Sequence, residues 1–210
     1  MKRLQPVDFD LGRAGEELRE FEALLGARSE LAERTDVLPF FNNRVQLTAL
    51  VGSLSRPARC DAVAFEFNLF GAFVADAALA HRDNRAFTLI EFEDAAQDSL
   101  FARRRKRDTP HWSRRFESGF NQAIDWFWKL ADQRQTAVFR DLFGSSEAQF
   151  DAVLVIGRDR HHSAADLQRL EWRSQNVVVE SKHIQVFTYD RLARDLRIQF
   201  DTLRRLTAGR

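Results

Sequence analysis

The order of residue patterns predicts an α/β fold, in which a mixed β-sheet is flanked by helices and preceded by a helical N-terminal part. Three observations predict it: helical spacing of apolar residues before residue 55, three β-rich runs between residues 60 and 93, and alternating helical and strand patterns from residue 112 to 205. The chain has 210 residues, enough for one sizeable core. We therefore expect residues 1–55 to pack on a core of residues 56–210 as one structural unit.

The N-terminal part is expected to contain two main helices. In the stretch 14–25, leucine and phenylalanine recur at helical spacing, and Gly26 can end that helix. A second helix is expected over about residues 39–54, with Pro39 in its first turn and Gly52 near its end. The polar segment between the two is expected to be helical in part.

Three β-rich runs follow, at residues 60–70, 72–80 and 86–93. The polar link before the third run predicts a hairpin whose two-residue turn is Asp83-Asn84. Both residues tolerate the positive φ that a type I′ turn requires. This turn sets a register in which the numbers of paired residues sum to 167.

The second half of the chain alternates helices and strands. A basic loop over about residues 97–111 leads into an amphipathic helix at 112–132. Its apolar stripe consists of Phe116, Phe120, Ile124, Phe127 and Ala131. A buried strand follows at 151–157, then a helix at about 163–174, a strand at 183–190 and a closing helix to about residue 205.

Two glutamates interrupt the third β-rich run. Glu91 and Glu93 are two positions apart on a strand and therefore share a face. The predicted register places Asp76 opposite Glu91, and like charges at facing positions destabilise a sheet. A divalent cation would resolve the repulsion, because Mg²⁺ binds to carboxylates and completes its coordination with waters and substrate phosphates. The alternative is a solvated polar strand face.

The carboxylate pattern resembles that of the PD-(D/E)xK nuclease superfamily, which has an aspartate on one strand and Glu-x-Lys on the next. The chain departs from the pattern at Glu93, which stands where lysine is usual; some type II restriction enzymes look similar. On the following helix, Gln122 and Trp126 are one turn apart, with Gly119 on the same flank. This helix resembles that of RecB-like nucleases, in which the glutamine supports the site.

Two further motifs narrow the resemblance. Ile156-Gly157-Arg158 ends a buried strand, and Thr188-Tyr189-Asp190 precedes the closing helix. Together with the N-terminal helix they resemble the Shedu-type antiviral nuclease domain, over roughly residues 14–205. The resemblance implies a restriction-endonuclease-like fold, metal-dependent cleavage of DNA phosphodiester bonds and a role in defence against phage.

The resemblance also implies roles for individual residues. Asp76 and Glu91 would bind Mg²⁺, with Mn²⁺ as an alternative cofactor. Glu93 would be a further metal ligand or the base that takes a proton from the attacking water. Gln122 would orient a ligand or a water.

Charge and composition limit the partners. The net charge is +1, from 32 basic and 31 acidic residues, so binding to DNA requires a local patch. The basic run supplies one, and we expect it to contact backbone phosphates: Arg103, Arg104, Arg105, Lys106 and Arg107. Cys60 is the single cysteine, which excludes an intramolecular disulfide and a cysteine-based zinc cluster. Without a signal-like start or an apolar run of 18 residues, we expect no membrane partner and a cytoplasmic location; homo-oligomerisation stays open.

Several alternatives remain at the sequence level. Glu180-x-Lys182 is a literal E-x-K motif, but no aspartate-bearing strand precedes it, so we place it outside the site. Either Glu30 or Glu33 can supply an additional carboxylate from a helix. The second functional hypothesis is a nuclease-fold module that binds or senses nucleic acid without catalysis, and the third is an oligomerisation scaffold.

Overall fold

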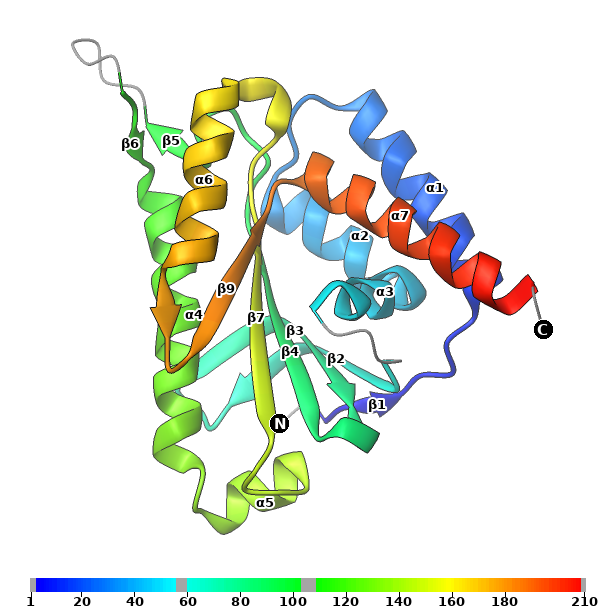
Figure 1. The fold of residues 1–210 in the computed structure, drawn as a ribbon, viewed down its shortest axis with the longest axis vertical. Coiled ribbons are helices and arrows are strands. Elements are labelled where there is room, and N and C mark those ends of the chain that lie inside the picture. The colour runs from blue at the N-terminus through cyan, green and yellow to red at the C-terminus, as the bar shows by residue number, and fades with distance from the viewer. Residues whose placement is uncertain (1–2, 56–59, 103–108, 209–210) are drawn as a thin grey trace.

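The computed structural model describes residues 3–55, 60–102 and 109–208 (Figure 1). In this part of the chain a mixed sheet has the strand order β1-β2-β3-β4-β7-β9-β8. Strands β1 to β4 are antiparallel neighbours, whereas β4, β7 and β9 run parallel. The strands are β1 (Gln5–Pro6), β2 (Ala62–Leu69), β3 (Phe73–His81), β4 (Ala86–Phe92), β7 (Gln149–Val155), β8 (Val178–Val179) and β9 (Lys182–Phe187). The predicted α/β fold is confirmed.

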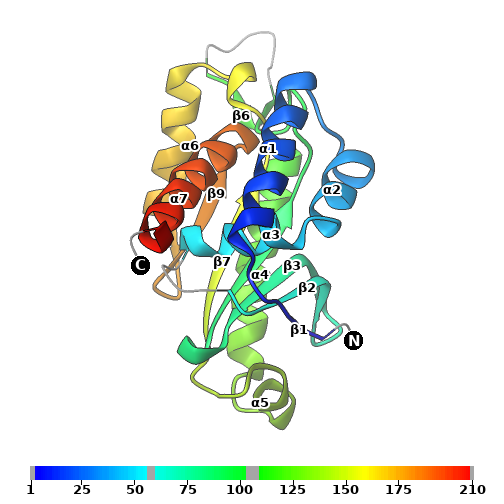
Figure 2. The same cartoon turned by 90° about the vertical axis from the view of Figure 1, so that its right-hand side faces the viewer.

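Helices cover both faces of the sheet. One face carries α1, α2, α3 and α7, and the other carries α4 and α6 (Figure 1). Viewed from the side, α1 and α7 lie next to each other (Figure 2). The helices are α1 (Leu11–Ala27), α2 (Leu38–Asn42), α3 (Val45–Ser55), α4 (Arg114–Gln133), α5 (Ala137–Phe143), α6 (Ala164–Asn176) and α7 (Tyr189–Ala208). No helix in the described ranges is long and apolar enough to cross a membrane.

Strand β4 divides its side chains between two hydrophobic cores. Phe87 and Leu89 are buried with residues of α4, whereas Ile90 and Phe92 are buried with residues of α1, α3 and α7. This alternation follows the two-residue period of a strand covered on both faces. Residue 91 therefore lies on the α4 side of the sheet.

The N-terminal helices differ from the prediction at their ends. Helix α1 begins at Leu11, because the Asp10 side chain accepts a hydrogen bond from the Arg13 N–H at 3.0 Å and caps it. It continues through Gly26 to Ala27. The single helix predicted over 39–54 is wrong: Asn43 separates α2 from α3, and its Nδ2 donates to the Pro39 carbonyl at 2.8 Å.

The β3–β4 hairpin has the predicted register with a different turn. Its pairs run from His81↔Ala86 to Ala77↔Ile90, so the paired numbers sum to 167. The type I′ turn is wrong, however, because residues 82–84 form a 3₁₀ turn and Arg85 adopts the left-handed conformation, with φ of 49°. A longer loop built on a helical turn preserves the same pairing.

Two elements of the second half were misjudged. The short helix α5 was not predicted, although Thr136 caps its start and Gly144, with φ of 74°, ends it. The strand predicted over 183–190 ends at Phe187, because Thr188 Oγ1 accepts from the Arg191 N–H and starts α7. A small separate sheet pairs β5 (Phe101–Ala102) with β6 (His111–Trp112).

Candidate functional site

The predicted acidic residues meet where β3 separates from β4. The ladder ends at the pair Ala77↔Ile90, one pair before Asp76 and Glu91 would face each other. At this point Asp76 Oδ2 accepts a hydrogen bond from the Phe92 N–H at 2.7 Å. The carboxylate therefore replaces a ladder carbonyl, and the strands open at the carboxyl end of β4.

Helix α4 holds the side chain of Glu91. The Gln122 Nε2 donates to Glu91 Oε1 at 2.8 Å and to the Val74 carbonyl at 3.2 Å. The other oxygen, Glu91 Oε2, is buried and has no hydrogen-bond partner among the described residues. Burying a carboxylate oxygen without a partner costs free energy, so this atom is ready to accept a cation or a donor.

Glu93 is buried beside this pair and is held at both its side chain and its backbone. Its Oε2 accepts from Arg115 Nη1 at 2.8 Å, and its carbonyl accepts from the Tyr189 hydroxyl at 2.6 Å. Gly119 faces it closely, because a Cβ there would lie 3.3 Å from Glu93 Oε1 and 2.9 Å from Leu154 Cδ1. The glycine thus permits the close approach that its place on α4 predicted, although side chains rather than backbone approach it.

We call the five acidic groups at this opening the carboxylate cluster: Glu33, Asp76, Glu91, Glu93 and Asp94. Burial, with the charges of Glu33 and Glu93, raises the pKa of Asp76 to about 7, although the Phe92 N–H opposes the shift. Burial and the charge of Asp76 raise the pKa of Glu91 to about 9. The pKa of Glu93 is also raised by burial, against the lowering effect of Arg115. Desolvation is therefore the main cause of these raised pKa values, and repulsion between the carboxylates adds to it.

The donor chemistry at Asp76 and Glu91 fits a hard divalent cation. Both are oxygen donors and both are driven toward the protonated form; one buried oxygen of Glu91 has no partner in the described part of the chain. Mg²⁺ needs only one or two protein carboxylates when waters and phosphates complete its coordination. In the described ranges, no group of three or more His, Cys, Asp or Glu side chains is placed to hold a metal ion. Three-carboxylate ligation including Glu93 therefore stays a prediction.

The structure places only one of the two glutamates that the sequence left open, Glu30 and Glu33, beside the other carboxylates. Glu33 starts a π-helical turn (residues 33–37); its Oε2 lies 3.3 Å from Arg115 Nη1, and its N–H donates to Asp94 Oδ1 at 2.7 Å. The side chain of Glu30 instead accepts from the Gln97 N–H at 2.9 Å. Glu33 thus belongs to the carboxylate cluster, where its charge contributes to the raised pKa of Glu91.

The IGR and TYD motifs meet behind the site in a partly buried group of hydrogen bonds around Arg158 and Asp190, which we call the clasp. Arg158 donates from Nε and Nη2 to the two carboxylate oxygens of Asp190, each at 2.9 Å. It also donates to the carbonyls of Leu25 at 2.9 Å and Arg28 at 2.7 Å, at the end of α1. The motifs therefore join β7, α7 and α1, while Tyr189, next to Asp190, holds the backbone of the site.

The chain matches the family described as Shedu protein SduA, C-terminal, over residues 30–193. The chain belongs to the Shedu family. No curated protein matches it. The Shedu match includes the whole carboxylate cluster, the helix that bears Gln122 and both motifs of the clasp.

Sequence reasoning missed Arg115 in this Shedu domain. A signal was present: Arg115, Gly119, Gln122 and Trp126 are spaced i, i+4, i+7 and i+11, which places them along one side of α4. Trp126 at the end of this stripe is fully buried in the core. The predicted phosphate-binding run, residues 103–107, lies outside the described residues.

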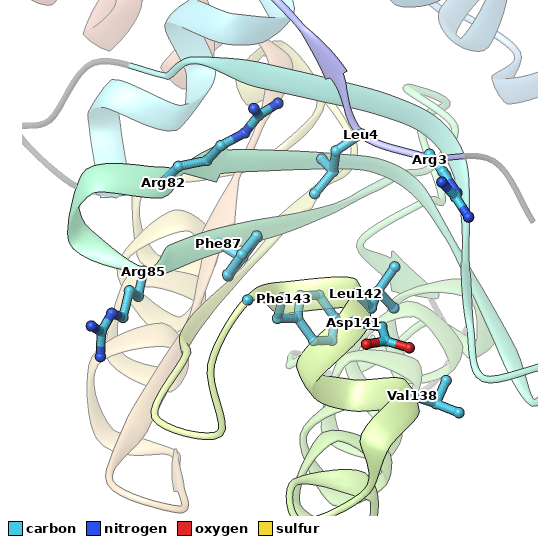
Figure 3. A pocket seen from close by; sticks show the side chains of 10 residues that line it. Arg3, Leu4, Arg82, Arg85, Phe87, Val138, Asp141, Leu142 and Phe143 are labelled. Atoms are coloured by element: carbon cyan, nitrogen blue, oxygen red, sulfur yellow. The ribbon is translucent and has the colours of Figure 1, made fainter.

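A cavity of about 840 Å³ lies away from the carboxylate cluster, at the amino end of β4. Arg82, Arg85, Phe87 and Phe143 are among its lining residues. Figure 3 shows the side chains of Arg82 and Arg85 extending in different directions. The guanidinium groups of these two residues do not converge, and none of the predicted site residues that the structure describes lines the cavity.

The E-x-K motif lies on a different part of the sheet, at the turn between β8 and β9. Glu180 adopts φ of 49°, and its exposed carboxylate lies 3.3 Å from Lys182 Nζ. Strand β7 separates β9 from β4.

We expect the double variant Glu180→Gln/Lys182→Ala to keep any cleavage activity within about threefold of the parent, because surface ion pairs contribute little. If this variant loses activity while Glu91→Gln stays active, the site lies at the E-x-K motif and our assignment to the end of β4 is wrong.

Proposed function

We propose that this Shedu domain is a metal-dependent deoxyribonuclease of the PD-(D/E)xK type that acts in defence against phage. The observation that carries the proposal is the buried Oε2 of Glu91, which has no hydrogen-bond partner among the described residues and lies beside the desolvated carboxylate of Asp76. Membership in the Shedu family supports the defence role. DNA is the proposed substrate.

In this proposal Asp76 and Glu91 hold Mg²⁺ or Mn²⁺. When bound, such an ion neutralises charge at the scissile phosphate and lowers the pKa of a water. Gln122 keeps Glu91 in one orientation through its hydrogen bond to Oε1. Glu93, whose pKa is raised by burial, is our assignment for the carboxylate that accepts the proton of the attacking water.

A cleavage assay tests the proposal. The full chain is incubated with linear, supercoiled and single-stranded DNA in Mg²⁺, in Mn²⁺ and in EDTA. We expect cleavage with at least one divalent ion and none in EDTA. Equal cleavage in EDTA, or cleavage that survives in Asp76→Asn, would contradict the proposal.

The basic run offers a separate test of DNA binding. Replacing Arg103, Arg105 and Arg107 by alanine should weaken duplex binding for all sequences alike, since phosphate contacts carry no base information. The slope of log K against log salt should shrink by roughly 0.9 per lost phosphate contact. Fluorescence anisotropy across a salt series measures both the affinity for duplex DNA and the salt slope. An unchanged slope would make the run an ordinary surface loop.

A second function is favoured by a specific observation. The carboxylate of Glu93 is engaged by Arg115, and no group of three ligands is assembled in the described ranges. A nuclease-fold module that binds or senses nucleic acid without cleaving it fits this arrangement. Divalent-dependent DNA binding with no cleavage in any of the assays above would establish it.

A further inference from the structure

Arg115 is the cation paired with the carboxylate cluster in the part of the chain that the structure describes. Its Nη1 lies 2.8 Å from Glu93 Oε2 and 3.3 Å from Glu33 Oε2, and its Nη2 lies 2.9 Å from Asp94 Oδ2. These carboxylates come from the N-terminal turn and from the end of β4. Two distant segments of the chain therefore fix the position of one guanidinium group.

The guanidinium is more exposed than the groups that hold it. The Arg115 side chain is 42% exposed, against 11% for Glu93, 25% for Glu33 and 24% for Asp94. A guanidinium carries five N–H donors in a rigid fork, more than these three contacts use. Such a fork matches two oxygens of a phosphate. The three carboxylates thus hold the Arg115 guanidinium in place, and its exposed part remains available to bind a phosphate.

The position of Arg115 on α4 relates it to the Asp76–Glu91 pair. It precedes Gln122 by two helical turns on the same side of the helix, a separation of about 10 Å along the axis. Gln122 holds Glu91 directly, at 2.8 Å. One helix therefore presents an amide to the carboxylate that would bind a metal and a cation next to it.

We propose that Arg115 binds a DNA phosphate at the edge of the Asp76–Glu91 site, and that Glu93, Glu33 and Asp94 hold its guanidinium there. This inference rests on the part of the proposed function that makes DNA the substrate of the Asp76–Glu91 site. In this inference Glu93 anchors the Arg115 guanidinium, a role that Glu91 does not have. Because the carboxylate cluster repels phosphate, the contribution of Arg115 should be larger when a divalent ion is bound.

Binding measurements test the inference without relying on cleavage. The affinity of the full chain for a DNA duplex is measured across a salt series in EDTA and in Ca²⁺, an oxygen-preferring divalent ion, with gels to show that the duplex stays intact. For Arg115→Ala we expect about 5- to 30-fold weaker binding in Ca²⁺ and a salt slope smaller by about 0.9. Arg115→Lys should recover part of this affinity, since it keeps the charge and loses the fork.

Arg204→Ala is the control, because it removes the same charge from an exposed side chain in the last turns of α7. A loss of DNA affinity equal to that of Arg115→Ala would reduce the effect to general surface charge and overturn the inference.

Calorimetric titration with Mg²⁺ tests the role of Glu93. We expect Glu93→Gln to bind Mg²⁺ within about threefold of the parent while losing DNA affinity, and Glu91→Gln to lose Mg²⁺ binding. Loss of Mg²⁺ binding in Glu93→Gln would make it a ligand and overturn the anchoring role.

The outcomes separate this inference from the proposed function. A parent chain that cleaves DNA, with Arg115→Ala binding and cleaving equally well, would refute the inference and leave the nuclease assignment standing. A parent chain that never cleaves, with Arg115→Ala showing the lost phosphate contact, would refute the nuclease assignment and support the inference.

Discussion

The variant Glu91→Gln is expected to lose divalent-dependent DNA cleavage by at least about 10²- to 10³-fold, the loss seen when a principal electrostatic group is removed from an active site. Glutamine has nearly the same shape as glutamate and still offers an oxygen to Gln122. The variant should therefore keep the fold. The loss would come from the missing negative charge, without which Asp76 alone faces the cation.

The same substitution is expected to stabilise the metal-free protein, in a pH-dependent manner. Burial raises the pKa of Glu91 from 4.5 to about 9, so the folded state binds more protons than the unfolded state across that window. Stability therefore falls as pH rises from about 4.5 to 9. Removing the group relieves this penalty, and the variant should gain about 1–3 kcal/mol near pH 8, a rise in Tm of several degrees.

Thermal melts in EDTA at pH 5, 7 and 9 measure this effect. The difference in Tm between Glu91→Gln and the parent should be close to zero at pH 5 and grow with pH. Added Mg²⁺ should stabilise the parent increasingly as pH rises, because the cation competes with protons for Asp76 and Glu91. A variant that melts below the parent at every pH and still cleaves DNA would make Glu91 a structural residue.

The variant Arg158→Ala is expected to lose about 3–5 kcal/mol of unfolding free energy, the cost of breaking a buried ion pair by removing one partner. The Arg158 side chain is only 3% exposed and makes two hydrogen bonds to Asp190. Its removal leaves the carboxylate of Asp190 with the Asp159 N–H as its remaining donor among the described residues, and takes the Arg158 donors from the carbonyls of Leu25 and Arg28. Burial opposes ionisation of Asp190, but Arg158 and the Asp159 N–H outweigh it and lower its pKa.

Urea denaturation measures the loss, and Arg194→Ala is its control. Arg194 also lies near the clasp, 2.9 Å from Asp159 Oδ2, but its side chain is 60% exposed. Removing it should cost no more than about 1 kcal/mol, as for other surface pairs. Equal losses in the two variants would show that the clasp contributes no more than a surface contact.

We also expect Arg158→Ala to weaken Mg²⁺ binding, because Tyr189 is next to Asp190 in the chain and its hydroxyl donates to the Glu93 carbonyl.

Much of the site follows from local patterns in the sequence. The β-rich runs and the polar link between them determined the hairpin register, which the structure reproduces through Ala77↔Ile90. The two-residue period of β4 placed Glu91 and Glu93 on one face, and the helical period of α4 brought Gln122 toward that face. These features depend on residues close in sequence, whose geometry is set by backbone sterics and side-chain period. Turn type and helix ends were less predictable, because single side chains such as Asn43 decide them.

Only the tertiary structure decided which distant groups share the site. Glu33 and Asp94 are 61 residues apart and meet because the N-terminal turn packs at the end of β4. Arg158 reaches Leu25 across 133 positions, so its role as a clasp is invisible in the IGR motif itself. Arg115 neutralises Glu93 only because α4 crosses the sheet at that point. Periodicity specifies the face on which a side chain lies, whereas its partner depends on how the elements pack, and the burial that raises the pKa of Glu91 arises only from that packing.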